Sequence, residues 1–202
     1  EALRRGLPVC WMDTMDEVEL ESLRALKPDI IISCGFGIIF PPSVLDLPRI
    51  GCINVHTALL PKHRGATPCA HVILDGDSES SVSIHVTESG IDTGALLAQQ
   101  RFPVFPDDNS MDVYIASCTL AESMILEVVD TIAEHGMDSA TPQPVEERSY
   151  DQRFAETAAR IDWRKTAPEI ACLIRAAYVY VPAYFEFRGE CVSVVLASAT
   201  TT

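Results

Sequence analysis

Three residues of types that could act on an acyl carbon stand close together in the sequence. Asn54 and His56 belong to the run CINVH, and Asp92 lies in the run SGIDTG. On an extended strand, residues two apart point to the same face, so the amide and the imidazole are expected to lie side by side. An amide can donate to an oxygen that gains negative charge, an imidazole can take a proton from an amine, and a carboxylate can orient both the imidazole and a bound water. The three residues together predict a site for the formation and breakdown of a tetrahedral intermediate at an acyl carbon.

Each of the three also has a purely structural interpretation. Asn54 could end a strand with a local turn bond, and His56 could be a surface histidine or a hydrogen-bonded core histidine. Asp92 stands between two glycines, where an Asx-turn is common. Taken one at a time, the residues leave both interpretations open.

The surrounding patterns predict the elements that would position these residues. Short apolar or alternating runs predict strands over 29–34, 52–56, 81–86 and 95–102, and helical spacing predicts helices over 16–26, 68–74 and 110–134. Thr67 is expected to be the N-cap of the second helix. The first run is expected to be a strand buried on both faces of a parallel sheet. Strands interleaved with helices predict an α/β fold: a mostly parallel, Rossmann-like sheet with helices on both faces.

A change of composition divides the chain. The run SATPQPVEERS at 139–149 has two prolines and few apolar residues, which is typical of a linker. We therefore expect a catalytic domain over 1–138, a linker over 139–150, and part of a C-terminal domain over 151–202. In that last part the sequence predicts a helix over 167–177 and a β-hairpin around Arg188-Gly189-Glu190.

Composition is that of an ordinary soluble globular protein, with 48% hydrophobic and 22% charged residues. No apolar run reaches the roughly 18 residues of a membrane span, and the start has no signal pattern, so we expect a cytoplasmic protein without membrane partners. The seven cysteines show no C-x-x-C pair and indicate reduced thiols, with Cys34 and Cys52 expected as small buried apolar residues. The formal charge of −14 lies in residues 1–150 and offers no electrostatic footprint for nucleic acid.

The sequence N-V-H-x-x-L-L-P-K-x-R-G followed by G-I-D-T-G resembles the folate-dependent formyltransferases, most closely the methionyl-tRNA formyltransferases. The resemblance runs from about Pro8 to about Leu196 and includes ARIDW and the later IRA. It implies an enzyme that transfers a formyl group from 10-formyltetrahydrofolate, as co-substrate, to a primary amine such as that of initiator methionyl-tRNA. All three positions of the family's catalytic Asn, His and Asp set match Asn54, His56 and Asp92.

The same resemblance implies two binding regions. The pterin pocket would be bounded by Phe36, Gly37, Ile38, Ile39, Val86, Thr87, Glu88 and Ser89. Core packing is the alternative for at least one of Ile38 and Ile39, and the lone G-x-G at 35–37 is weak evidence for a dinucleotide site. The loop with Leu60, Pro61, Lys62, Arg64 and Gly65 would face the substrate, or would be a solvated charged turn. We expect no metal, and we interpret His63, His71, His85 and His135 as structural or exposed.

The acceptor stays open at this point, because the ARIDW junction is shared by amino-sugar N-formyltransferases and by the formyl-hydrolase domain of 10-formyltetrahydrofolate dehydrogenase. Relatives also begin with a strand and a helix that precede the first residue here, so the N-terminal strands are expected to be missing. The alternatives are therefore an amino-sugar N-formyltransferase, a 10-formyltetrahydrofolate hydrolase, or a catalytically silent folate-binding fragment. The oligomeric state is not specified by the sequence.

Overall fold

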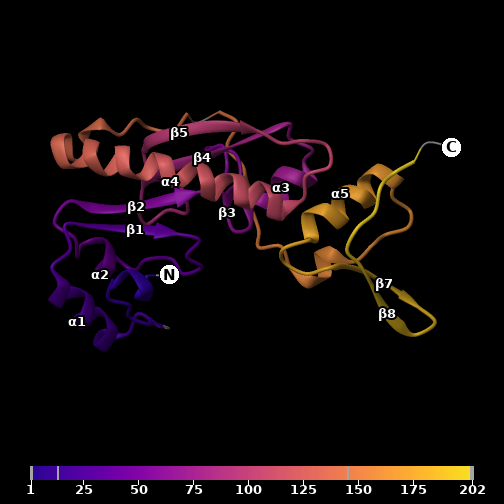
Figure 1. Cartoon of the computed structure of the whole chain (residues 1–202), viewed down its shortest axis with the longest axis horizontal. Coiled ribbons are helices and arrows are strands. Elements are labelled where there is room, and N and C mark those ends of the chain that lie inside the picture. The colour runs from indigo at the N-terminus through magenta and orange to yellow at the C-terminus, as the bar shows by residue number, and fades with distance from the viewer. Residues whose placement is uncertain (1, 13, 145, 201–202) are drawn as a thin grey trace.

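The computed structural model of the chain describes residues 2–12, 14–144 and 146–200. The elements are labelled in Figure 1 and have these bounds: η1 Leu3–Arg5, α1 Glu17–Leu26, β1 Ile30–Cys34, α2 Pro42–Leu45, β2 Gly51–His56, β3 Arg64–Gly65, α3 Pro68–Leu74, β4 Glu79–Val86, β5 Leu96–Pro103, α4 Ser110–His135, η2 Gly136–Ser139, β6 Tyr150–Asp151, η3 Glu156–Ala159, α5 Ala167–Ala177, β7 Ala183–Phe187 and β8 Glu190–Val194. The helices and strands expected from the sequence are all present, within one to three residues at their ends.

The central sheet has four strands in the order β1-β2-β4-β5. β1 pairs with β2 in parallel, whereas β4 is antiparallel to both β2 and β5. β1, β2 and β5 therefore run in one direction and β4 in the other, which confirms a mostly parallel set of strand directions. β4 is reversed relative to β5 because the loop over 87–95 is too short for the helical crossover that a parallel pair needs.

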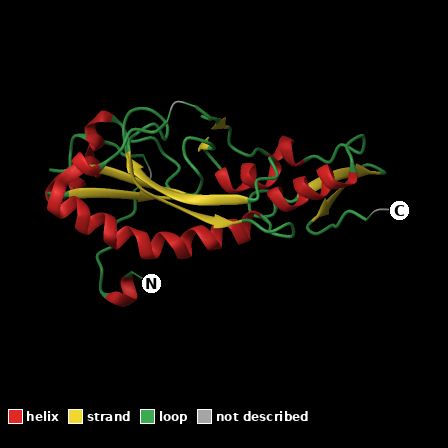
Figure 2. Ribbon diagram, turned by 90° about the horizontal axis from the view of Figure 1, so that it is seen from above, coloured by secondary structure: helices red, strands yellow, loops and turns green. Residues whose placement is uncertain are grey.

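The two faces of this sheet are chemically different. Ile53, Val55, Val82 and Ile84 point to one face, where they form an apolar core with Met124, Val128 and Ile132 of α4. Figure 2 shows α4 running along this face of the sheet. The opposite face carries polar side chains, described below, and the short helix α2 lies over it: the thiol of Cys52 is 3.8 Å from the carbonyl oxygen of Val44. Helices thus lie on both faces, as expected.

The ends of the main helices follow from local capping. Asp16 accepts from the N–H groups of Val18 and Glu19 at the start of α1. Asn109 with Asp112 begins α4, and Thr166 with Glu169 begins α5, each pair as a capping box. No helix in the described part of the chain combines the length and the apolar character needed to cross a bilayer.

The C-terminal part packs against α3. Its helix α5 and the β7–β8 hairpin lie beyond the end of the sheet in Figure 1. A second apolar core joins the two regions, and its buried members are Cys69, Ala70, Val72, Ile73, Val104, Val113, Phe154, Ala159, Ile161, Ile174, Ala176, Ala177 and Ala183. The helix over 167–177 and the hairpin around Arg188 are confirmed.

Three local expectations are wrong. β1 is not buried on both faces, because it is the edge strand of the sheet: Ile32 is 41% exposed. Cys34 is exposed for the same reason, whereas Cys52 in the interior strand β2 is buried as expected. Thr67 precedes α3 but does not cap it, because its backbone is left-handed and its hydroxyl instead accepts from the N–H of Phe154.

Candidate active site

Asn54, His56 and Asp92 meet on the polar face of the sheet. Both strand residues lie on β2, and Asp92 lies in the loop between β4 and β5. The Asn54 amide nitrogen is 3.3 Å from one carboxylate oxygen of Asp92, and the Nδ1 atom of His56 is 3.7 Å from the other. The three groups proposed from the sequence are therefore neighbours, although Asp92 is 36 residues beyond His56 in the chain.

The orientation of the Asn54 amide is fixed from the neighbouring strand. The hydroxyl of Ser33 on β1 donates to Asn54 Oδ1 at 2.7 Å. Ser33 and Asn54 are partners in the parallel register, so their side chains stand together on the same face. With its oxygen engaged by Ser33, the amide presents its N–H₂ donors toward Asp92.

Hydrogen bonding and burial keep the His56 ring neutral, with a free lone pair on Nδ1. Its Nε2–H donates to the carbonyl oxygen of His63 at 2.8 Å, which leaves the lone pair of Nδ1 facing Asp92. Burial lowers the pKa of His56 below its ordinary value, and this outweighs the opposing effect of the Asp92 charge. At neutral pH the ring is therefore uncharged and can accept a proton at Nδ1.

Asp92 carries the negative charge of the site. Burial alone would raise its pKa, but the hydrogen bond with His85, the positive charge that His56 carries at acid pH and the N–H of Gly65 together lower the pKa of Asp92 to about 2. The Gly65 N–H donates to Asp92 Oδ2 at 2.7 Å. Gly65 is required there, because its φ is 106° and a Cβ atom would collide with the carbonyl oxygen of Asp151.

His85 is a further site residue that the sequence interpretation missed. It is 2% exposed, and its Nε2 atom is 3.3 Å from both Asn54 Nδ2 and Asp92 Oδ1. Its Nδ1–H donates to the Val86 carbonyl. A neutral His85 accepts from Asn54, and a protonated His85 donates to Asp92. The sequence signal was partial: the alternation of 81–86 puts His85 on the same face as Ser81 and Ser83, but only the pairing of β4 with β2 places it beside Asn54.

The loop after β2 lies against the polar face and is anchored there. The hydroxyls of Ser81 and Ser83 both donate to the Ala58 carbonyl, and Gln99 donates to the Leu60 carbonyl. Its two cations are also paired with other side chains, which argues against the alternative of a solvated charged turn. Lys62 contacts Asp77 at 3.2 Å, and Arg64 is only 6% exposed. A substrate contact for Leu60, Pro61, Lys62, Arg64 and Gly65 stays a prediction.

The segment expected to be a plain linker helps to build the site. Gln143 accepts from Arg64 at 2.7 Å and donates to the carbonyls of Asp92 and Gly94, so it ties the two loops together. Tyr150 accepts from Arg64 at 2.9 Å, and β6 pairs with β3. Nothing in the composition of this segment indicates these contacts, because they join residues 49 to 86 positions apart.

The residues expected to bound the pterin pocket offer an apolar surface and an unsatisfied hydroxyl. Phe36, Ile38 and Ile39 are 46%, 44% and 64% exposed, so core packing of either isoleucine is excluded. Val86, Glu88 and Ser89 lie in or beside the β4–β5 loop. In that loop the buried Thr87 hydroxyl has no hydrogen-bond partner. Such a combination fits a flat heteroaromatic group with polar edges.

Both segments also meet β2 at the same residue. Thr87 N–H donates to the Cys52 carbonyl at 2.8 Å, and the segment after β1 folds back so that Val44 contacts the Cys52 thiol. Cys52 is two residues from Asn54 and shares its face.

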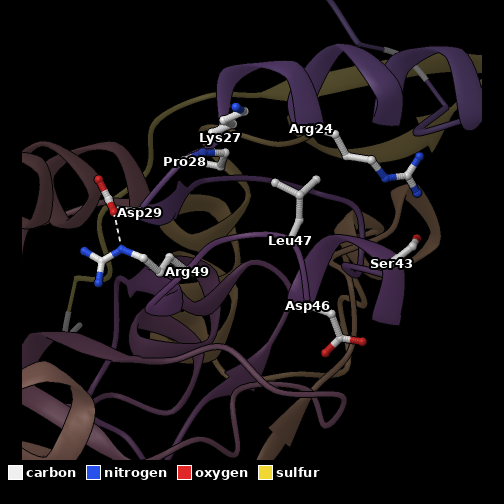
Figure 3. Close-up of a pocket in the computed structure, with 8 residues that line it drawn as sticks. All are labelled: Arg24, Lys27, Pro28, Asp29, Ser43, Asp46, Leu47 and Arg49. Carbon is white, nitrogen blue, oxygen red and sulfur yellow. Dashed lines mark hydrogen bonds and ion pairs between the residues drawn. The ribbon is translucent and has the colours of Figure 1, made fainter.

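A separate hollow lies between α1 and the α2–β2 connection, and Figure 3 shows its lining. It contains none of the site residues named above. Arg49 pairs with Asp29 at 2.6 Å, and Arg24 pairs with Glu17 and Glu21, so most of the positive charge there is balanced locally. Among the described residues, no three His, Cys, Asp or Glu side chains are grouped so as to hold a metal ion.

An α/β fold that brings an oriented Asn, His and Asp together is the kind of arrangement found in enzymes. Comparison with known proteins identifies the family. The chain matches the family model "Formyl transferase" over residues 12–129 and "Formyl transferase, C-terminal domain" over residues 154–202. The chain therefore belongs to the formyl transferase family.

Individual relatives agree with this assignment. Methionyl-tRNA formyltransferase of Paramagnetospirillum magneticum is 34% identical over 200 residues, which cover 98% of this chain and 66% of the relative, so the chain spans slightly less than two thirds of that protein. A 4-N formyltransferase from Francisella tularensis has a similar structure, with a TM-score of 0.77 and 26% identity over 94% of this chain and 78% of that one. An N-formyltransferase from Helicobacter canadensis, solved with folinic acid and dTDP-3-aminofucose, has the same fold, with a TM-score of 0.74 and 23% identity over 96% of this chain and 68% of that one.

Proposed function

We propose that this protein transfers a formyl group from 10-formyltetrahydrofolate to a primary amine. The observation that carries the proposal is the meeting of Asn54, His56 and Asp92, each oriented by a partner outside the set, in a chain of the formyl transferase family. Ser33 orients the amide, the His63 carbonyl orients the imidazole, and the Gly65 N–H orients the carboxylate. Such orientation is what a preorganised acyl-transfer site requires.

Each residue has a distinct role in this proposal. Asn54 Nδ2 donates to the formyl oxygen as that oxygen gains negative charge. His56 Nδ1, which carries a lone pair at neutral pH, accepts the proton of the attacking amine. Asp92 stays ionised, accepts a hydrogen bond from the Asn54 amide, and offsets the positive charge that develops on the imidazole when it takes up a proton.

The co-substrate supplies a formyl group on a nitrogen that leaves as an amine when its bond to the formyl carbon breaks, and His56 returns to that nitrogen the proton it took from the acceptor. We propose that its pterin is held between the segment with Phe36, Gly37, Ile38 and Ile39 and the loop with Val86, Thr87, Glu88 and Ser89. The exposed apolar side chains of the first segment and the unpartnered hydroxyl of the second support this placement. The Thr87 N–H donates to the carbonyl of Cys52, two residues before Asn54 on β2.

For the acceptor we propose methionyl-tRNA, supported by relatives of that name at 34% identity. A second candidate is an amino sugar linked to a nucleotide. It is favoured by the similarity to the sugar-modifying proteins of known structure and by the acidic charge of residues 1–150, which repels a phosphate backbone. Water as acceptor would make the protein a hydrolase.

We also propose a division into a catalytic unit over 1–138, a connection over 139–150 and a C-terminal unit over 151–202. The second apolar core, which is built largely from residues after 151, supports the last boundary. A cytoplasmic location is part of the proposal, since all seven cysteines are free thiols.

Turnover of 10-formyltetrahydrofolate by the purified chain, followed by absorbance, tests this function. The assay is run with methionyl-tRNA, with amino-sugar nucleotides and without acceptor. Acceptor-dependent turnover supports transfer and identifies the acceptor class, whereas release of formate without acceptor identifies a hydrolase. No turnover from a folded sample that still binds a folate analogue would identify a silent folate-binding protein instead.

The His56→Ala variant tests the assigned base in the same assay. Loss of the proton acceptor is expected to reduce kcat by more than about 10²-fold, because general base catalysis typically contributes 10²–10⁴. His135→Ala is the matched control, since the His135 side chain is 65% exposed on α4 and contacts only the adjacent Glu134. Near-normal turnover by folded His56→Ala would remove His56 from the mechanism.

A further inference from the structure

A buried histidine outside the proposed catalytic set is held between two carboxylates. His63 lies in the loop between β2 and α3 and is 1% exposed. Its Nδ1 atom is 2.7 Å from Asp151 Oδ2, and its Nε2 atom is 2.8 Å from Asp77 Oδ2. Ionised carboxylates only accept hydrogen bonds, so both ring nitrogens must carry protons for both contacts to be attractive. The geometry therefore describes a buried imidazolium with an acid on each side.

The two acids come from different parts of the fold. Asp77 follows α3, and Asp151 belongs to β6 in the segment that connects the sheet to the C-terminal part. Although burial would raise the pKa of Asp77, the hydrogen bonds from His63 and Lys62 lower it, so Asp77 is ionised. The His63 ring thus joins three separate segments through charge-assisted hydrogen bonds, which are stronger than neutral ones.

The main chain of His63 reaches the catalytic set directly. Its carbonyl accepts from His56 Nε2 at 2.8 Å, and this contact decides which nitrogen of His56 is free to act as a base. The backbone of His63 is left-handed, with a φ of 58°, a conformation that a residue other than glycine keeps only when its surroundings enforce it. Its N–H donates to the Ser149 hydroxyl at 2.8 Å. The hydrogen bonds of the His63 ring and of its N–H with Ser149 together hold the backbone in this conformation.

A second contact of the same loop depends on Asp151 as well. Two residues after His63, the Gly65 N–H donates to Asp92 Oδ2, and Gly65 pairs with Asp151 between β3 and β6. Asp151 therefore holds the loop at two points: its side chain holds the His63 ring, and its main chain lies beside Gly65. Movement of Asp151 would therefore displace both the His63 carbonyl, which contacts His56, and the Gly65 N–H, which contacts Asp92.

We propose that His63, as a cation held between Asp77 and Asp151, is a positioning residue that sets the tautomer of His56 and the place of Asp92. The inference rests on the proposed function for its effect on catalysis, but its effect on His56 can be measured without turnover. Two other titratable groups face this cluster: Lys62 Nζ lies 3.2 Å from Asp77, and His71 Nδ1 lies 3.8 Å from Asp151. Both ring nitrogens of His63 must carry protons for the ring to hold the loop, because a lone pair on either nitrogen would face a carboxylate.

The test is nitrogen-15 NMR of the histidine rings in the whole chain, because protonated and unprotonated ring nitrogens resonate in separate ranges. In the unmodified protein near pH 7 we expect His63 protonated at both nitrogens and His56 protonated at Nε2 only. In His63→Gln, which keeps a donor toward one acid and removes the charge, His56 should become a mixture of tautomers. His135→Gln, at an exposed position, should leave the His56 signals unchanged.

The Asp151→Asn variant provides an independent arm if His63→Gln does not fold. It removes one of the two carboxylates that hold the His63 ring, so His56 should again become a mixture of tautomers. In an active protein, His63→Gln should also reduce kcat by about tenfold or more, with KM for the folate changed by less than about twofold, as expected of a group that orients a catalytic residue.

Two results would overturn the proposal: a His63 ring that is neutral at pH 7 in the unmodified protein, or unchanged His56 signals in a folded His63→Gln variant. If no acceptor gives turnover, the proposed function fails while the ring spectra still decide the role of His63. The two failures are therefore distinguishable.

Discussion

Replacing Asp92 with asparagine should lower the stability of the protein in a pH-dependent way. The Asp92 side chain is 13% exposed, and its pKa is about 2 against an ordinary value of 3.8. At 1.36 kcal/mol per pKa unit, this difference corresponds to about 2 kcal/mol of stabilisation of the folded state by the ionised carboxylate. Asparagine keeps the shape but removes the charge, and its N–H₂ group would oppose either the Gly65 N–H or the Asn54 amide.

The sign of the pH effect follows from the lowered pKa. A carboxyl group whose pKa is depressed on folding contributes its full stabilisation above its unfolded value and loses it as the pH falls through the folded value. The difference in unfolding free energy between the unmodified protein and Asp92→Asn should therefore be about 2 kcal/mol at pH 7 and should shrink between about pH 4 and pH 2.

Urea denaturation at pH 7, 4.5 and 3 measures this difference, and the comparison cancels the titration of the other acids. Asp107→Asn, at an exposed position in the turn before α4, is the matched control and should change stability by less than about 0.5 kcal/mol. Equal stability of Asp92→Asn and the unmodified protein at pH 7, or a difference that does not depend on pH, would refute the assigned electrostatics.

Two further predictions concern the imidazole base and the glycine beside Asp92. Because burial lowers the pKa of His56 and the neutral ring is the base, the acid limb of the kcat profile should lie below pH 6.5; a limb above that pH would contradict the assignment. Gly65→Ala should destabilise the fold by about 2–3 kcal/mol in thermal unfolding, because a left-handed φ and a collision with the Asp151 carbonyl combine. Gly76→Ala, with a φ of 69° and open space around it, should cost only about 1 kcal/mol, and equal losses would show that the collision is relieved.

Much of the fold could be predicted because its signals are local. The apolar run at 30–34, the alternation at 81–86 and the helical spacing at 110–135 each depend on residues within one element. The wrong predictions concern exposure rather than element type. Cys34 and Ile32 have the composition of a buried strand, but β1 lies at the sheet edge, and strand order is not encoded in the strand's own residues.

The candidate site shows the same division. The two-residue spacing of Asn54 and His56 predicts a shared face, and the structure places them so. His85 was missed because a histidine alternating with serines on β4 has no catalytic signature until β4 pairs with β2. Gln143 was missed because its contacts with Arg64 and Asp92 join distant parts of the chain through a segment of ordinary linker composition.

The sequence by itself determined the elements, the pairing of an amide and an imidazole on one strand, and the family, since these depend on local periodicity and on motif residues. Only the tertiary structure decided which groups orient Asn54, His56 and Asp92 and set their protonation. The Ser33 hydroxyl, the His63 carbonyl and the Gly65 N–H act on Asn54, His56 and Asp92 from other segments, and the ring of His63 is in turn held by Asp77 and Asp151. Hydrogen-bond direction and burial set the charge of each group, and both arise only when segments far apart in the chain are brought together.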